Sequence, residues 1–172
     1  MTAMKIDPSG ASWYRLYRGV AYLNTIAALV WTMVIIIPAE PFSYLPPIIV
    51  GGGAGEWFLL AYVLFVVVGI GGFGALSAFL TTVELHENRI IDARTMWPAL
   101  ILLSIGAAGS CLLLAVAGAV GGYASVYQSA STSYIDSLLT PYVYPITSMV
   151  SLTVIGAALA VLSMARARWP SS

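Results

Sequence analysis

The chain has 172 residues, of which 60% are hydrophobic and 8% are charged, and its formal net charge at pH 7 is zero. Its mean hydropathy is +0.92. Ordinary soluble domains carry about 25% charged residues, so this composition excludes a soluble globular protein. The sequence also lacks the basic patch that nucleic-acid binding requires, which excludes nucleic acid as a partner.

Four apolar stretches are long enough to cross a membrane, since about 20 helical residues at a rise of 1.5 Å span roughly 30 Å of hydrocarbon. A helix is the expected form of each, because lipid offers no partner to an unpaired backbone amide. The stretches are residues 19–37, 57–83, 98–120 and 144–165. They predict an all-α membrane protein, a four-transmembrane-helix bundle that forms a single domain over residues 1–172.

The first connection, residues 38–56, reads "PAEPFSYLPPIIVGGGAGE". It is too apolar for a plain solvated loop and too rich in proline and glycine for a helix. We expect it to lie along the membrane surface or against protein. Glu56, at its end, is a candidate polar site at the mouth of a path. The simpler interpretation of Glu56 is an acid at a helix N-terminus, where its negative charge interacts favourably with the positive end of the helix dipole.

The second, third and fourth stretches contain small residues four positions apart. Such spacing lets helix backbones approach closely, and in lipid this packing is a main source of helix association. The faces serve either the internal bundle or a neighbouring chain. The glycine cluster at residues 69–74 also marks a candidate bend. The candidate packing or partner residues are Gly71, Gly74, Ala75, Ala78, Gly106, Ser110, Gly118, Gly156 and Ala160.

The segment "VELHENRIIDAR", residues 83–94, concentrates titratable side chains between two apolar stretches. Glu84, His86 and Glu87 offer oxygen and nitrogen ligands, yet His86 is the single histidine of the chain. A zinc site normally needs three or four protein ligands, and haem held by two histidines is excluded within one chain. We therefore predict a solvated connection of mixed charge. No cofactor is expected to be bound by this chain alone, although contact with lipid or quinone stays open.

The second outer connection, residues 121–143, is rich in tyrosine. Tyrosine is favoured both at bilayer interfaces and at protein contacts, because its ring is apolar and its hydroxyl is polar. Tyr123, Tyr127 and Tyr134 are therefore either an aromatic belt or a partner surface. Within this connection "STSYIDSLL" predicts a short interfacial helix capped by Ser131 or Thr132.

The basic residues predict the orientation. All seven precede the first stretch, lie between the second and third, or follow the fourth, and the connections 38–56 and 121–143 contain none. Cytoplasmic loops carry the excess of Lys and Arg. We expect a multi-pass protein of the cell membrane with both termini cytoplasmic. The basic residues are Lys5, Arg15, Arg18, Arg89, Arg94, Arg166 and Arg168.

Three functions follow as hypotheses. The first is an accessory subunit of a larger membrane complex, of the respiratory or another energy-transducing class, in which hetero-oligomers with other membrane subunits and contacts with lipids are favoured over homo-oligomers. The alternative is a small homo-oligomeric channel or transporter, with Asn24, serines and threonines along a path and Glu56 at its mouth. The third is a membrane enzyme acting on lipid or quinone through His86 and Glu87. The middles of the apolar stretches contain no ionisable residue, which argues against a proton-coupled pump.

Overall fold

The computed structural model describes residues 12–37 and 40–169. Its long elements are α1 (Trp13–Ile36), a second span that is helical without interruption over Gly53–His86, α5 (Ala93–Gln128) and α6 (Thr132–Ala165). All four are long and apolar enough to cross a membrane. The prediction of an all-helical chain with four candidate spans is confirmed.

The second span changes its helical geometry along its length. It begins with the 3₁₀ turn η1 (Gly53–Gly55) and continues as α3 (Glu56–Leu64), the π-helix η2 (Phe65–Gly72), α4 (Phe73–Thr81) and the π-helix η3 (Thr82–His86). The glycine cluster at residues 69–74 thus falls at the junction of η2 and α4. π-helical turns are rare and are found mostly as short insertions in α-helices.

The connection 38–56 contains more helix than we predicted. α2 (Leu45–Val50) forms within it, and its prolines stand in the first turn. The N–H groups of a first turn have no intrahelical partner, so proline costs little there. The expectation of a non-helical segment is therefore wrong for residues 45–50, while residues 38–39 lie outside the described part of the chain.

The connection 121–143 is also largely helical, which corrects the loop that we expected. α5 continues to Gln128 and ends where Ser129 adopts a left-handed conformation with φ of 49°. Ser131 then caps α6, and its hydroxyl accepts a hydrogen bond of 3.4 Å from the backbone N–H of Tyr134. The predicted cap at Ser131 is confirmed, but the helix that it starts is the whole of α6. Its internal prolines, Pro141 and Pro145, do not end it.

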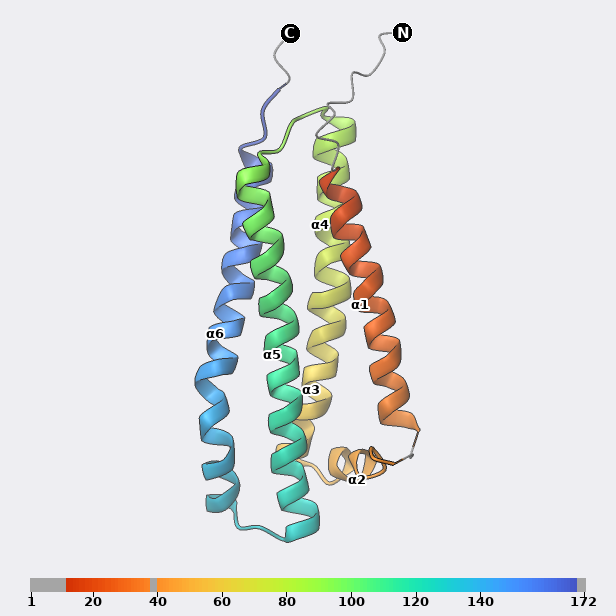
Figure 1. Ribbon diagram of the computed structural model, residues 1–172, viewed down its shortest axis with the longest axis vertical. Helices are drawn as coiled ribbons and strands as arrows, with labels where there is room; N and C mark the ends of the chain where they lie inside the picture. The colour runs from red at the N-terminus through yellow and green to blue at the C-terminus, as the bar shows by residue number, and fades with distance from the viewer. Residues whose placement is uncertain (1–11, 38–39, 170–172) are drawn as a thin grey trace.

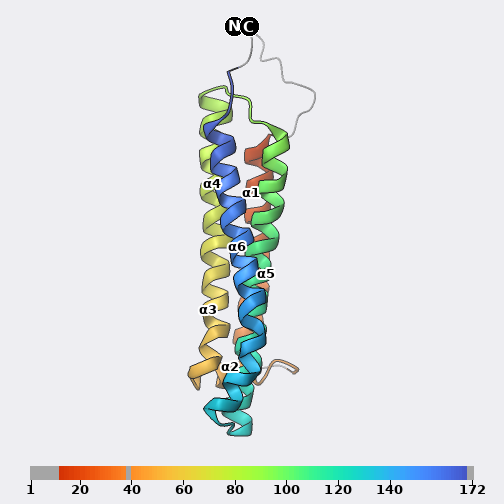
Figure 2. The ribbon, with the colours of Figure 1, turned by 90° about the vertical axis from the view of Figure 1, so that its left-hand side faces the viewer.

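The four helices form a staggered row in which each packs on the one before it in the chain. α1 lies against the second span, the second span against α5, and α5 against α6 (Figure 1). In the view turned by 90°, α6 lies in front of α5, and the second span is displaced to one side (Figure 2). Large apolar side chains outside the core cover the outward faces of α1 and α6, and these faces suit contact with lipid acyl chains.

The two ends of the row differ in charge. Six arginines lie where α1 begins, where the second span meets α5 and where α6 ends; we call this the basic end. The opposite end, where α2 lies and α5 turns into α6, carries three acidic residues and is called the acidic end. The arginines are Arg15, Arg18, Arg89, Arg94, Arg166 and Arg168, and the acidic residues are Glu40, Glu56 and Asp136.

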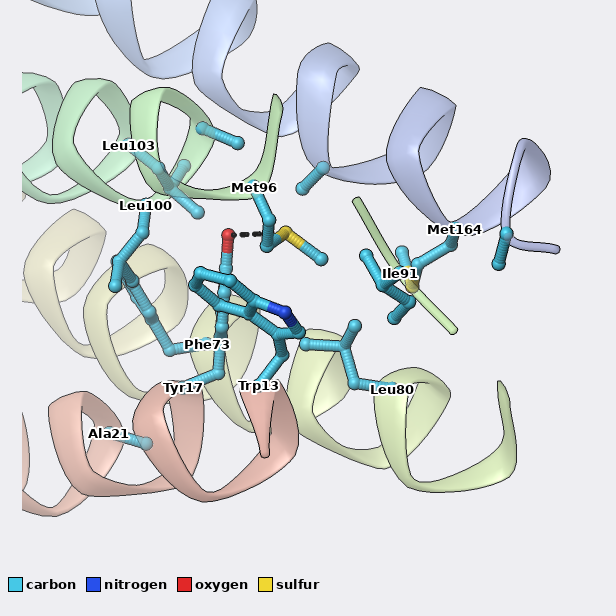
Figure 3. Packing of buried hydrophobic residues seen from close by; sticks show 13 residues of the cluster. Trp13, Tyr17, Ala21, Phe73, Leu80, Ile91, Met96, Leu100, Leu103 and Met164 are labelled. Carbon is cyan, nitrogen blue, oxygen red and sulfur yellow. Dashed lines mark hydrogen bonds between the residues drawn. The ribbon is translucent and has the colours of Figure 1, made fainter. Parts of the chain in front are cut away.

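The largest cluster of buried side chains lies toward the basic end, between α1, α4, α5 and α6. Tyr17 and Phe73 are fully buried there, with ring centroids 5.8 Å apart. The Tyr17 hydroxyl donates a 3.4 Å hydrogen bond to the Met96 sulfur, as Figure 3 shows. Trp13 also packs edge-on against Trp97 at 5.3 Å, so α1 reaches α5 as well as the second span.

Candidate functional site

Glu84 lies at the basic end and binds the N-terminus of α1. Its Oε1 accepts a 3.0 Å hydrogen bond from the Trp13 backbone N–H, and its Oε2 accepts one of 3.4 Å from Tyr14. The first N–H groups of a helix have no intrahelical partners, and a carboxylate there also interacts favourably with the helix dipole. Glu84 is therefore a half-buried tertiary cap, which differs from the solvated position that we expected.

The next residues tie the second span to the segment after α6. Arg89 forms an ion pair with Glu87 at 3.2 Å, and its Nε donates a 3.0 Å hydrogen bond to the carbonyl of Ala167. Ile90 and Arg168 form an isolated antiparallel bridge, with hydrogen bonds of 2.8 and 3.0 Å. The charged connection therefore has a structural role: it joins the end of the second span to the segment that follows α6.

His86 is not placed together with Glu84 and Glu87 as a set of metal ligands would be. Its side chain is exposed, whereas the carboxylates of Glu84 and Glu87 are engaged with α1 and with Arg89. Across residues 12–37 and 40–169, there is no group of three His, Cys, Asp or Glu side chains placed to hold a metal ion.

Several predicted small residues serve internal packing. Gly118 lies against the backbone of Trp57 and Phe58, and Gly156 lies against the backbone of Ala99 and Leu103. Gly106 faces the backbone and hydroxyl of Thr153 on α6, and Ala160 is fully buried. Ser110 instead donates a 3.1 Å hydrogen bond to the carbonyl of Ala107 within α5. Gly122, spaced four residues from Gly118, has the same role and fits against Ile48 of α2 and Gly55 of η1. Gly121, which no spacing singled out, fits against Ala54 of η1.

The remaining small residues lie on a different surface. Phe73, Ser77 and Leu80 form the buried face of α4, and the Ser77 hydroxyl donates a 2.9 Å hydrogen bond to the carbonyl of Tyr14. On the other side of α4 and of the preceding end of η2, the small residues are exposed, and a Cβ built on Gly74 meets no described heavy atom within 4 Å outside its own stretch of helix backbone. We call this surface the small-residue face: Gly71, Gly74, Ala75 and Ala78.

The predicted tyrosines gather around a cavity at the acidic end. Tyr123 and Tyr134 line it together with Tyr44, and its volume is about 450 Å³. Tyr127 stacks on Tyr123 with ring centroids 5.1 Å apart, so it supports the wall of the cavity without lining it. Glu56 is not one of the lining residues; it stands in the first turn of α3, where an acid interacts favourably with the helix dipole.

Asn24 and Thr32 form polar contacts between helices inside the spans, with partners that their own sequence positions do not reveal. The Asn24 side-chain amide donates a 2.7 Å hydrogen bond to the carbonyl of Gly69 in η2. Thr32 and Tyr62 share a hydrogen bond of 2.8 Å between their hydroxyls. Polar residues in apolar stretches are the signal for such contacts, but the partner of each lies on another helix.

Comparisons with protein-family models, with curated proteins and with solved structures find no match to this chain.

Proposed function

We propose that this chain is a subunit of a larger membrane protein assembly, and that its small-residue face receives a helix of a different membrane protein. The observation that carries the proposal is a contrast between helix faces whose small residues have the same spacing of four positions. The small residues of α5 and α6 are used inside the chain, whereas Gly71, Gly74, Ala75 and Ala78 are exposed. Between helices in lipid, association depends on close van der Waals packing, which such a face provides.

The alternative of a channel or transporter has less support. It needs polar groups along a path, but Asn24 is bonded to Gly69, and Thr32 is bonded to Tyr62 and to its own helix. On α6, the hydroxyls of Thr147 and Ser151 donate to carbonyls one turn earlier. These groups are occupied within the chain, so the subunit interpretation explains the exposed surface better.

Gly74→Leu tests the subunit proposal, because the added side chain holds an incoming helix away from the backbone. After purification in a mild detergent, mass spectrometry should find a stoichiometric partner with the wild type and lose it with Gly74→Leu. The matched control is Gly19→Leu on α1, since Gly19 is also exposed and its Cβ position is open. The control should retain the partner.

Two results contradict this proposal. One is a partner that survives Gly74→Leu undiminished, which would place the contact elsewhere. The other is a wild-type chain that purifies alone, or only as a complex of its own copies by native mass spectrometry. The unfolding transition of Gly74→Leu should match that of the wild type, which separates loss of the partner from loss of the fold.

We further propose that the basic end is cytoplasmic, in keeping with the excess of Lys and Arg in cytoplasmic loops. In a Cys111→Ala background, a membrane-impermeant thiol reagent applied to intact cells should label Ser133→Cys, at the acidic end. It should not label His86→Cys, at the basic end, until the membrane is opened. The reverse pattern would invert the threading. Both positions are exposed and lie at the ends of their spans, where we expect the side of the membrane to decide access to the reagent.

A further inference from the structure

The cavity at the acidic end is open to its surroundings and is lined by residues from three helical segments. α2 is preceded by Tyr44, α5 contributes Tyr123 and Gln128, and α6 contributes Tyr134 and Leu138. Small-molecule sites commonly have volumes of about 300–1,000 Å³, and a cavity of about 450 Å³ falls within that range. This space is therefore large enough for a small ligand.

The aromatic rings form the walls of this cavity. Tyr44 and Tyr123 meet at 86° with centroids 6.0 Å apart, so two rings form a corner. Tyr127 stacks on Tyr123 and limits the rotation of that ring. The face of an aromatic ring carries negative potential, and rings arranged around a cation attract it most when the cation is weakly hydrated.

The charges around the cavity have one sign. Glu40 lies close to Tyr44 in the sequence, and its carboxylate accepts a 2.6 Å hydrogen bond from Ser43, the residue before Tyr44. Asp136 projects from the opposite side of α6 to the lining residues Tyr134 and Leu138, because it is two residues from each along the helix. No Lys or Arg occurs in residues 19–88 or 95–165, which include every residue that lines the cavity. The local field therefore favours a positive ligand and disfavours an anion.

We propose that this cavity binds a methylated ammonium group, such as the one in choline. The tyrosine rings attract its charge, and the apolar lining of Ala119, Val120 and Ala124 accommodates its methyl groups. A primary ammonium ion or a metal ion is strongly hydrated, and the lining residues include no carboxylate to replace that water, whereas a methylated ammonium sheds water readily. The binding site is separate from the small-residue face and does not depend on a partner chain.

Titration of the purified full-length chain in detergent with choline chloride tests the proposal, with heat or tyrosine fluorescence as the signal. The control ligand is the neutral isostere of choline in which carbon replaces nitrogen. The isostere should bind about two- to fivefold more weakly, the size of one exposed cation–π contact. Equal binding of both ligands, or no binding of choline, overturns the proposal.

Variants locate the site. Tyr123→Leu should weaken choline binding about two- to fivefold, while Tyr123→Phe, which keeps the ring, should retain it. Tyr144→Leu is the matched control, since Tyr144 is exposed on α6 outside the lining. Glu40→Gln should also weaken binding, because it removes the acidic charge next to Tyr44. If Tyr123→Leu loses its fold, Tyr44→Leu provides a second test of the same wall, and undiminished binding in the folded variant contradicts the assignment.

A methylated ammonium group occurs both in free cations and in choline lipids, and the membrane composition separates these sources. In nanodiscs of phosphatidylglycerol, free choline should bind as it does in detergent. If the lipid headgroup is the natural ligand, nanodiscs of phosphatidylcholine should block that binding, and if the ligand is a free cation they should not. Failure of choline to bind in both phosphatidylglycerol and detergent rejects the site for either source.

Discussion

Gly118→Ala is expected to lower the free energy of unfolding by about 1–3 kcal/mol, although alanine is the better helix former. The new Cβ would lie 2.9 Å from the Trp57 carbonyl carbon and 3.0 Å from the Cα of Phe58. Backbone atoms cannot rotate away as the tip of a side chain does, so α5 and α3 must separate. Separation along this contact also disturbs the packing of Phe58 against Trp31.

Gly74→Ala is the matched control for Gly118→Ala, because it makes the same chemical change on an exposed face. It should leave the free energy of unfolding unchanged or raise it slightly, since alanine favours the helix and meets no neighbour among the described residues. Unfolding in mixed detergent micelles, followed by circular dichroism, measures both variants. Equal stability of the two would contradict the close approach of α5 to α3.

Glu84→Ala is expected to destabilise the chain by about 1–2 kcal/mol, because it leaves the first N–H groups of α1 without their acceptor. Trp13, whose N–H bonds to Glu84, also carries a buried side chain that packs against Trp97. Release of this turn therefore loosens the contact of α1 with α5. Hydrogen exchange at residues 13–16 should increase, and that measurement reports directly on the cap.

Glu87→Ala provides the comparison for Glu84→Ala. The Glu87 side chain is 42% exposed, and its ion pair with Arg89 is worth about 0–1 kcal/mol. Glu84→Gln should fall between Glu84→Ala and the wild type, since the amide keeps an acceptor oxygen but loses the charge. If Glu84→Ala and Glu87→Ala behave alike in both stability and exchange, Glu84 does not act as a cap.

The number and helical form of the spans could be predicted because each depends on its own residues alone. A long apolar stretch must satisfy its backbone hydrogen bonds internally in lipid, whatever its neighbours are. The helix extensions at both outer connections were not predictable in the same way. Gly121 and Gly122 have weak helix propensity, yet they are needed where α5 passes η1 and α2. Tertiary packing decides these boundaries.

The roles of the candidate site residues depended even more on distant contacts. Ser12 is the local N-cap of α1, but in the described chain its side chain makes no capping hydrogen bond, and Glu84 provides the cap from far along the sequence. Gly74 and Gly118 have similar sequence surroundings, yet one faces outward and the other faces α3. Spacing identifies a face of a helix, but it does not identify the neighbour of that face.

The staggered row has a consequence for how the chain is made. Each new helix packs on the one synthesised just before it, so a binding surface is already present when α5 or α6 enters the membrane. Contacts between neighbours in the sequence form quickly, because little loop entropy is lost when they close. We expect the bridge between Ile90 and Arg168 to close last, because one of its two residues lies close to the end of the described chain. Assembly of the helices is then expected to follow the order of their synthesis.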